Sequence, residues 1–326
     1  MAKKTSKKKI VVTGAAGAIG SHVAEALKKE NHDVVGIDIL TDYYSPEIKE
    51  INISDLEKAG ITIVRKNIAT EDLSDVLNGA QVIYHFAAQP GISATTSFEK
   101  YLENNIVATH KLLDAARKLK SLELFVHIST SSVYGAHADS DETAEPRPTS
   151  FYGVTKLAAE QLTLSYARDK GLPVVVLRLF SVYGERERPE KLYHKVIRNI
   201  LNNESFTLHE GSELHRRSYT HVADVVDACL LVLERVDAVT GEIFNIGTDK
   251  TITTGEGLAL IEKIMGKKIK YKKVPPRPGD QIETAAKIGK ARKILGYDPK
   301  VSPEEGLKRE VEWYKNKIHK RLKVKS

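Results

Sequence analysis

The sequence predicts an α/β fold in which a doubly wound parallel sheet is followed by a smaller C-terminal α/β lobe. Short apolar, β-branched runs alternate with helical patterns as far as about residue 185, and such runs are typical of buried parallel strands. A glycine-rich turn joins the first run to the first helical pattern. Beyond residue 185 the alternation gives way to short mixed segments and Pro-rich turns, which indicates a separate lobe.

The first expected strand, residues 9–13, leads into Gly14, Gly17 and Gly20, and a helical pattern follows. In a strand–turn–helix unit, such glycines allow a tight turn, the approach of a pyrophosphate and close helix–strand packing. The helix N-terminus then faces the phosphates. The sequence therefore predicts a Rossmann-type dinucleotide site. The spacing GxxGxxG departs from GxGxxG, so an ordinary glycine-rich turn is the alternative.

Asp38 ends the second expected strand, residues 33–38, about 20 residues past the glycines. A carboxylate at this place accepts hydrogen bonds from the adenosine ribose hydroxyls and repels a 2′-phosphate. This favours NAD over NADP. The alternative is an aspartate that only caps the next turn.

Later strands are expected to present their carboxyl ends to the same ligand, because in open α/β sheets that edge faces the binding crevice. The segments that leave these ends carry Gln89, Asn67 and the hydroxyls of residues 129–132. A strand at 242–246 is expected to rejoin the main sheet. The other expected strands are 61–64, 81–86, 124–128 and 174–179.

Two long helices are expected, one over residues 98–120 and one that begins near Tyr152. Tyr152 and Lys156 lie four residues apart, and so on one face of their helix. An ammonium beside a phenol favours the phenolate and lowers a pKa that starts near ~10. Tyr152 is therefore a candidate general base. The alternative is a surface lysine whose stem covers a half-buried ring.

Composition limits the class of protein. The chain has 326 residues, 41% of them hydrophobic, and a single cysteine, Cys229. This cysteine usage suits a reducing cytoplasm, and no apolar run approaches the ~20 residues of a membrane span. We therefore expect a cytoplasmic protein that does not bind membranes. The scattered histidines show no metal-ligand spacing, so no metal is expected.

The net charge of +7 belongs to the two ends of the chain. Residues 1–9 hold five Lys, and residues 315–326 hold five Lys and one Arg, so the remainder is net acidic. We expect solvated basic tails at 1–8 and 317–326, and no nucleic-acid binding, although the tails leave that alternative open. Between them we expect a cofactor domain at 9–185 and a lobe at 186–316 that mainly binds substrate.

Several segments together resemble the extended short-chain dehydrogenase/reductase superfamily, and within it the NAD-dependent nucleotide-sugar epimerases and dehydratases. They are TGAAGAIG, HFAAQPG, ISTSSVYG, YGVTK, LRLFSVYG, RRSYTHVAD and PPRPGD, in order over residues 8–316. Ala18 departs from the bulky residue usual at its position, and Asn67 replaces the usual adenine-contacting Asp.

Small differences within this family point to UDP-glucuronate 4-epimerases. Dehydratases carry Asp-Glu where Ser131 and Ser132 stand, and decarboxylases carry Glu at Ser132, so both are disfavoured. Ser181 after Phe180 resembles the small hydroxyl of UDP-glucuronate 4-epimerases, and the segment 183–190 resembles their GxRxRPD stretch.

The resemblance implies roles for particular residues. Tyr152, Lys156 and Thr130 would be catalytic, with Thr130 and Tyr152 at the sugar 4-oxygen and Lys156 on the nicotinamide ribose. The implied NAD-binding residues are Gly14, Gly17, Ala18, Ile19, Gly20, Asp38, Asn67, Ile68, Phe86, Ala87, Ala88, Gln89, Asn105, Ser129, Tyr152 and Lys156. The implied substrate-binding residues are Pro90, Thr130, Ser131, Ser132, Ser181, Arg186, Arg188, Arg217, Arg277 and Asp280.

Among these, Arg217 would hold the diphosphate, while Arg277 and Asp280 would hold the uridine ribose. Arg188, with Arg186 second, is the candidate for a substrate carboxylate; the alternative for each is a surface ion pair with a neighbouring glutamate.

The implied reaction is inversion at C4 of a UDP-sugar through a 4-keto intermediate, most closely UDP-glucuronate to UDP-galacturonate, in a homodimer. A UDP-glucose/UDP-galactose 4-epimerase is the nearest alternative. A UDP-glucuronate decarboxylase and a non-catalytic NAD-sensing module are less favoured, the latter because Tyr152 and Lys156 are both present.

Overall fold

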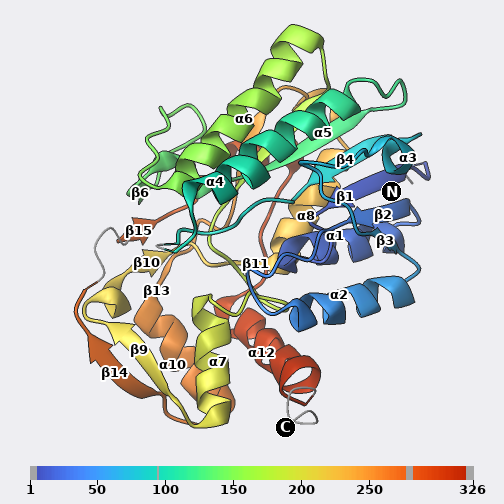
Figure 1. Cartoon of the computed structure of the whole chain (residues 1–326). Coiled ribbons are helices and arrows are strands. Elements are labelled where there is room, and N and C mark those ends of the chain that lie inside the picture. Colours follow the sequence, from blue (N-terminus) through green and yellow to red (C-terminus); the bar gives the residue numbers. More distant parts are fainter. Residues whose placement is uncertain (1–5, 94, 277–281, 321–326) are drawn as a thin grey trace.

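The central feature of the protein is a parallel sheet (Figure 1). The computed structural model describes residues 6–93, 95–276 and 282–320. Within these residues the sheet has seven strands in the order β12-β7-β5-β4-β1-β2-β3, all paired in parallel. The predicted doubly wound fold is confirmed, and β12 joins the sheet beside β7 as expected. The strands are β1 (Lys9–Thr13), β2 (Asp33–Ile37), β3 (Thr62–Val64), β4 (Val82–His85), β5 (Leu124–Thr130), β7 (Val174–Leu179) and β12 (Ile243–Ile246).

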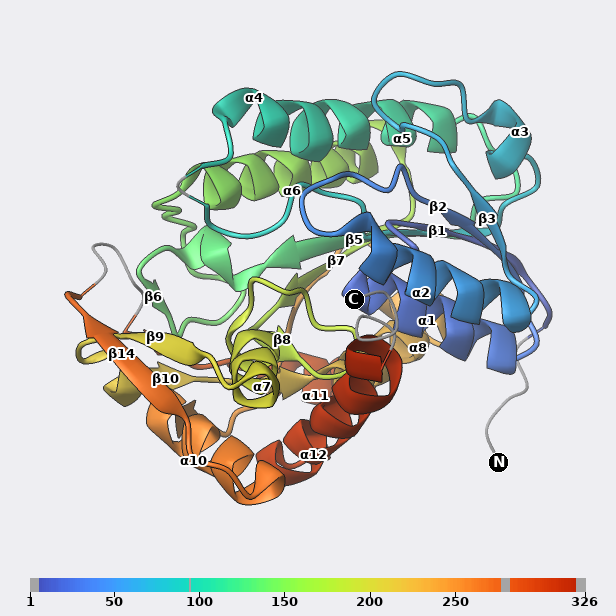
Figure 2. The ribbon, with the colours of Figure 1, turned by 60° about the horizontal axis from the view of Figure 1, so that its bottom comes forward.

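Helices cover both faces of this sheet (Figure 2). The β-branched and aliphatic strand residues are buried on both sides, which excludes water from the backbone hydrogen bonds of the sheet. One face packs mainly against α1 (Ala18–Lys29) and α8 (Val222–Leu233), and the other against α5 (Ala108–Ala116) and α6 (Phe151–Lys170). The short helices α3 (Ser74–Leu77), α9 (Val236–Val239) and α11 (Gly289–Leu295) complete the layers.

The helix expected over residues 98–120 is present from Phe98 to Ala116, but it is not α-helical throughout. It consists of α4 (Phe98–Tyr101), a π-helical segment η1 (Leu102–Val107) and α5, which ends at Ala116. The π segment contains Asn105, which is buried, and the Asn105 backbone carbonyl accepts a hydrogen bond from the Thr109 hydroxyl at 2.6 Å. Single π turns of this kind often occur at functional sites.

The second lobe has its own core and packs against α2 (Pro46–Lys58). Ile48 and Ile51 of α2 join this core, which otherwise comes mainly from α7 (Leu192–Asn202), α10 (Thr254–Met265) and α12 (Pro303–Trp313). The remaining elements are β6 (His137–Ala138), β8 (Val182–Tyr183), β9 (Ser205–His209), β10 (Arg216–Arg217), β11 (Thr220–His221), β13 (Ile252–Thr253), β14 (Lys270–Val274), β15 (Glu283–Thr284), η2 (Ser131–Tyr134), η3 (Ser212–Leu214) and η4 (Tyr314–His319).

The boundaries of the basic tails differ from the expected ones at both ends. The Lys8 ammonium forms an ion pair with Glu123, and its backbone nitrogen donates to the His32 ring at 3.2 Å. Lys317 lies in η4 and binds Asp55 of α2 at 2.9 Å. These lysines are parts of the packed protein, because each meets a carboxylate from an element distant in sequence. In the described ranges, no helix is both long and apolar enough to span a membrane.

Candidate active site

The turn between β1 and α1 forms a cradle of backbone nitrogens. Gly14 has a left-handed backbone (φ 67°), and a Cβ there would lie 2.7 Å from the Ala87 nitrogen. A Cβ at Gly20 would overlap the Gly14 carbonyl oxygen. Gly17 caps α1 without a side-chain hydrogen bond, so its first turn keeps N–H groups for an anion. A dinucleotide pyrophosphate fits this cradle.

The first-turn residues Ala18 and Ile19 lie at the start of α1, half-buried. Asp38 follows β2 and is largely buried; its carboxylate accepts hydrogen bonds from the backbone nitrogens of Ala16 (3.1 Å) and Leu40 (2.8 Å). Lys49 of α2 lies beside it, with 3.9 Å between the ammonium and the carboxylate. This ion pair joins the strand end to α2, because Lys49 reaches Asp38 from that helix.

In the turn that follows β3, the Asn67 side-chain oxygen accepts a hydrogen bond from the Ala69 nitrogen at 2.8 Å, while Ile68 is buried. Asn67 therefore stabilises its own turn through that oxygen.

The loop after β4 lies between the cradle and α6. Phe86, Ala87 and Ala88 are partly buried along it, and the Ala87 nitrogen donates to the Thr13 hydroxyl at 3.2 Å. Pro90 follows Gln89, half-buried.

Asn105 braces this loop. Its side-chain oxygen accepts from the Gln89 nitrogen (2.7 Å), and its amide donates to the Thr155 hydroxyl (2.9 Å). Asn105 thus links the loop to α6. The sequence predicted only that Asn105 lies beside the cofactor, and not this structural role.

Tyr152 and Lys156 project from α6 toward the end of β5. Burial raises the pKa of Tyr152, whereas a hydrogen bond with Thr130 and the charge of Arg188 oppose that rise. The Lys156 ammonium donates to the Ile128 carbonyl at 2.6 Å, and burial lowers its pKa to about 8, opposed by Glu160. The ammonium is thus held at the end of β5, and the lowering of the Tyr152 pKa by Lys156 stays a prediction.

The hydroxyls at the end of β5 and the start of η2 divide into two groups. The Ser129 hydroxyl donates to the buried Glu160 carboxylate at 2.7 Å, so it belongs to the support beneath the site. Thr130 Oγ1 accepts from the Ser132 nitrogen (3.2 Å) and donates to the Ser132 hydroxyl (3.3 Å), and Ser131 is buried beside them at the start of η2. Ser181 lies beyond β7, where its carbonyl accepts from the Thr220 nitrogen at 3.2 Å.

Arg188 lies in the same site as Tyr152. A Cβ at Gly91 would meet both guanidinium nitrogens of Arg188, at 3.5 and 3.7 Å, and the Tyr43 hydroxyl at 3.5 Å. The Tyr101 hydroxyl donates to the Gly91 carbonyl at 2.7 Å, and the Tyr101 ring lies 6.3 Å from that of Tyr152. The structure thus joins a cation, three tyrosines and a glycine from four distant segments.

Arg188 also forms an ion pair with Glu190 at 3.1 Å. The alternative raised for this arginine, an ion pair with a neighbouring glutamate, is therefore present as well. Tyr43, Gly91, Tyr101 and Glu190 were not expected as site residues, since only the tertiary contacts select them.

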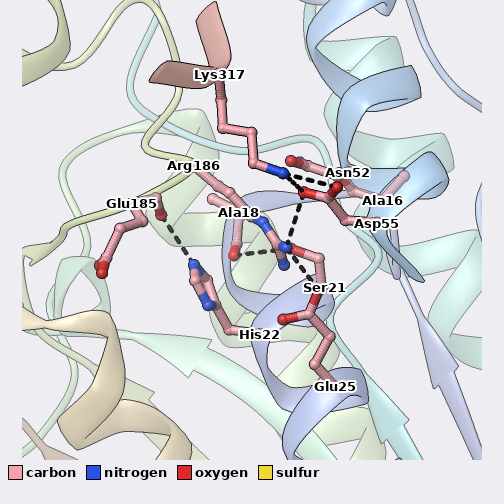
Figure 3. A network of polar contacts seen from close by, with 10 residues as sticks. All are labelled: Ala16, Ala18, Ser21, His22, Glu25, Asn52, Asp55, Glu185, Arg186 and Lys317. Atoms are coloured by element: carbon pink, nitrogen blue, oxygen red, sulfur yellow. Dashed lines mark hydrogen bonds and ion pairs between the residues drawn. The ribbon is translucent and has the colours of Figure 1, made fainter. Parts of the chain in front are cut away.

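Arg186 does not contact the Tyr152 site. Its guanidinium is buried against Glu25 of α1 (2.6 Å) and Asp55 of α2 (3.6 Å) (Figure 3). The expectation that it binds substrate is wrong, because the guanidinium is taken up by these buried ion pairs. Arg217 lies on β10 in the second lobe, and one of its guanidinium nitrogens donates to the Arg216 carbonyl. Arg277 and Asp280 lie outside the described residues.

Known proteins share this architecture along most of the chain. The model of the NAD dependent epimerase/dehydratase family matches residues 10–247. The crystal structure of a UDP-glucuronic acid 4-epimerase from Bacillus cereus, in complex with UDP-glucuronic acid and NAD, is 38% identical with a TM-score of 0.89, over 94% of this chain and 99% of that one. UDP-glucuronate 4-epimerase 1 of Arabidopsis thaliana is 34% identical, over 94% of this chain and 76% of its own length.

An uncharacterized UDP-glucose epimerase of Bacillus subtilis, YtcB, is 37% identical, over 93% of this chain and 96% of its own length. The matched family model covers the glycine cradle, Asp38, Tyr152 and Lys156 together. The chain therefore belongs to the NAD-dependent epimerase/dehydratase family.

Proposed function

We propose that this protein is an NAD-dependent UDP-sugar 4-epimerase that converts UDP-glucuronate to UDP-galacturonate. The observation that carries the proposal is the position of Arg188. Its guanidinium lies against Gly91, and its positive charge opposes the rise in the pKa of the Tyr152 phenol. A guanidinium in the same site as Tyr152 can bind the carboxylate of a sugar acid, since charge-assisted hydrogen bonds to carboxylates are strong. Similarity to UDP-glucuronate 4-epimerases supports the same substrate.

The residues around the 4-oxygen divide the chemistry between them. Tyr152 removes the proton of the sugar 4-hydroxyl and later returns a proton to the same oxygen. Thr130, which is hydrogen-bonded to Tyr152, steadies that oxygen as its charge changes. NAD, when bound, supplies reversible hydride transfer at C4, and Lys156 together with the glycine cradle holds it. The sugar turns about its diphosphate before hydride returns to the other face.

The 4-keto form of a glucuronate is a β-keto acid and loses carbon dioxide readily. Donors that hold the carboxylate near the plane of the carbonyl suppress that loss. Arg188, Ser131, Ser132 and Ser181 are the proposed donors, and positions 131 and 132 hold no acid. This arrangement favours epimerisation over decarboxylation.

Epimerisation of UDP-glucose to UDP-galactose is the second candidate. It is favoured by the similarity to the Bacillus subtilis protein, which is named as a UDP-glucose epimerase. Incubation of the purified protein with UDP-glucuronate, UDP-glucose and UDP-xylose separately, with products resolved by NMR, distinguishes the candidates. Nucleotide extracted from the protein is expected to be NAD, and mainly NADP in the extract would contradict the role of Asp38.

Arg188→Ala tests the substrate directly. We expect the specificity constant for UDP-glucuronate to fall roughly 10- to 100-fold, because a lost charge-assisted contact is worth about 1.5–3 kcal/mol. Activity on UDP-glucose should hardly change, and some pentose product should appear. Arg235→Ala, which removes an ion-paired arginine at the end of α8, serves as the control. An equal loss on both substrates without pentose would contradict the glucuronate assignment.

A homodimer completes the proposal. Phe98, Leu102 and Val107 are exposed on the α4–η1 segment, and Phe151 and Val154 are exposed on the adjacent α6. Neighbouring exposed apolar side chains on two helices suit a four-helix interface with a second copy. Light scattering at micromolar concentration should give the dimer mass, and a monomer mass would contradict this. Cytoplasmic location stays a prediction from cysteine usage.

A further inference from the structure

The loop that carries Arg188, residues 184–190, is held by groups from outside it. We call it the arginine loop. Arg186, two residues before Arg188, has a left-handed backbone conformation, which residues other than glycine rarely adopt. Such a conformation persists only where the surrounding contacts determine it. At Arg186 these contacts come from its own side chain.

The Arg186 guanidinium is inserted between two helices of the cofactor domain (Figure 3). It is 7% exposed, and its Nη2 lies 2.6 Å from Glu25 of α1 and 3.6 Å from Asp55 of α2. Lys317 of η4 binds the same Asp55 at 2.9 Å. The charges of two carboxylates and two cations therefore cancel in this cluster. The two ion pairs of Arg186 also oppose rotation of the loop.

The same two helices hold the glycine cradle. One turn from Glu25 on α1, the His22 ring hydrogen-bonds the Glu185 carbonyl at 3.0 Å, so α1 contacts the arginine loop twice. From α2, the Asn52 amide donates to the Ala16 carbonyl in the cradle at 2.9 Å. The arginine loop and the pyrophosphate cradle thus contact the same pair of helices.

We propose that Arg186 is a positioning residue for Arg188: by its contacts with Glu25 and Asp55 it sets the direction in which Arg188 meets the substrate carboxylate, relative to the cofactor cradle. This inference depends on the proposed function of Arg188. Arg186 itself does not touch the substrate, since its guanidinium is buried on the other side of the loop.

The test compares Arg186→Gln with Arg188→Ala and Lys317→Met in the full-length protein. Arg186→Gln keeps much of the side-chain volume but removes the charge. Lys317→Met removes a cation from the same cluster and leaves both Arg186 contacts intact. Each change is also placed in a Tyr152→Phe background, where calorimetry measures the Kd of UDP-glucuronate and of UDP without turnover.

Arg186→Gln should weaken UDP-glucuronate binding about 3- to 30-fold, which is the usual range for an indirect effect. UDP binding should change less than about twofold, and the active form should release some pentose. Arg186→Lys should recover part of the affinity, because an ammonium can keep one of the two ion pairs. Lys317→Met should leave the ratio of the two Kd values unchanged.

Three results would overturn the inference. The first is that Arg186→Gln lowers only the unfolding midpoint. The second is that it weakens the binding of UDP and of UDP-glucuronate by the same factor. The third is that Lys317→Met has the same selective effect as Arg186→Gln. If Arg186→Gln does not fold, Glu25→Gln removes the shorter ion pair and must give the same selective loss. If Arg188→Ala weakens UDP-glucuronate and UDP equally, the proposed function itself fails. If Arg188→Ala weakens only UDP-glucuronate but Arg186→Gln weakens both equally, only the positioning role of Arg186 is refuted.

Discussion

Glu310→Gln is expected to make the protein more stable than the wild type at alkaline pH. Glu310 of α12 and Glu187 of the arginine loop are both buried, at 1% and 4% exposure. Glu310 accepts a hydrogen bond from the Gly184 nitrogen at 3.2 Å, and Glu187 accepts one from the His194 nitrogen at 3.1 Å. The other Glu310 oxygen has no donor among the described residues, and the Glu187 carboxyl faces it. A proton shared between the two carboxyl groups satisfies this contact.

Burial and the neighbouring Glu187 raise the pKa of Glu310 well above its usual value, and burial raises the pKa of Glu187, opposed first by Lys191. A raised folded-state pKa contributes stability that is present below the unfolded pKa, near 4.5, and is lost as the pH rises through the folded pKa. One proton changes the free energy of unfolding by at most about 1.4 kcal/mol per pH unit. Glutamine supplies an N–H without ionising, so this decline should disappear.

Urea unfolding of both proteins at pH values from 5 to 9 measures the effect. The difference in free energy of unfolding should be small at pH 5 and should grow in favour of Glu310→Gln as the pH rises. Glu312→Gln, an exposed change on the same helix, is the control and should leave the slope unaltered. The shared-proton explanation is refuted if Glu310→Gln destabilises the protein equally at every pH.

Three further changes test other parts of the site. Tyr152→Phe should lower turnover by ~10²-fold or more while NAD stays bound, since it removes the acid–base proton and keeps the ring; near-normal turnover would contradict its role. Arg178→Met leaves the buried Glu160 without its 2.5 Å ion-pair partner and should cost about 3–5 kcal/mol in urea unfolding, and a cost below 1 kcal/mol would refute this. Glu190→Gln should strengthen UDP-glucuronate binding about 2- to 10-fold by calorimetry, because Glu190 competes for Arg188; weaker binding would mean that it orients Arg188 instead.

Local sequence patterns determined most of the cofactor-binding half. Runs of β-branched residues specify buried parallel strands, and the order strand, glycine turn, helix leaves few other structures open. Gly14, Gly20 and Asp38 therefore lie where they were predicted, because close backbone approach and strand-end position are local properties. Tyr152 and Lys156 share a face of α6 for the same reason.

Tertiary structure alone decided the directions of the charged side chains. Arg186 and Arg188 are two residues apart in one loop, yet one is buried against α1 and α2 and the other lies beside Tyr152. Sequence spacing could not separate them, because the left-handed backbone of Arg186 and its two carboxylate partners come from the packing of distant elements. Lys156 likewise shares a helix face with Tyr152, but the Ile128 carbonyl of β5 decides where its ammonium is directed. Long flexible side chains follow the charges and acceptors that the fold brings to them, and these lie far away in the sequence.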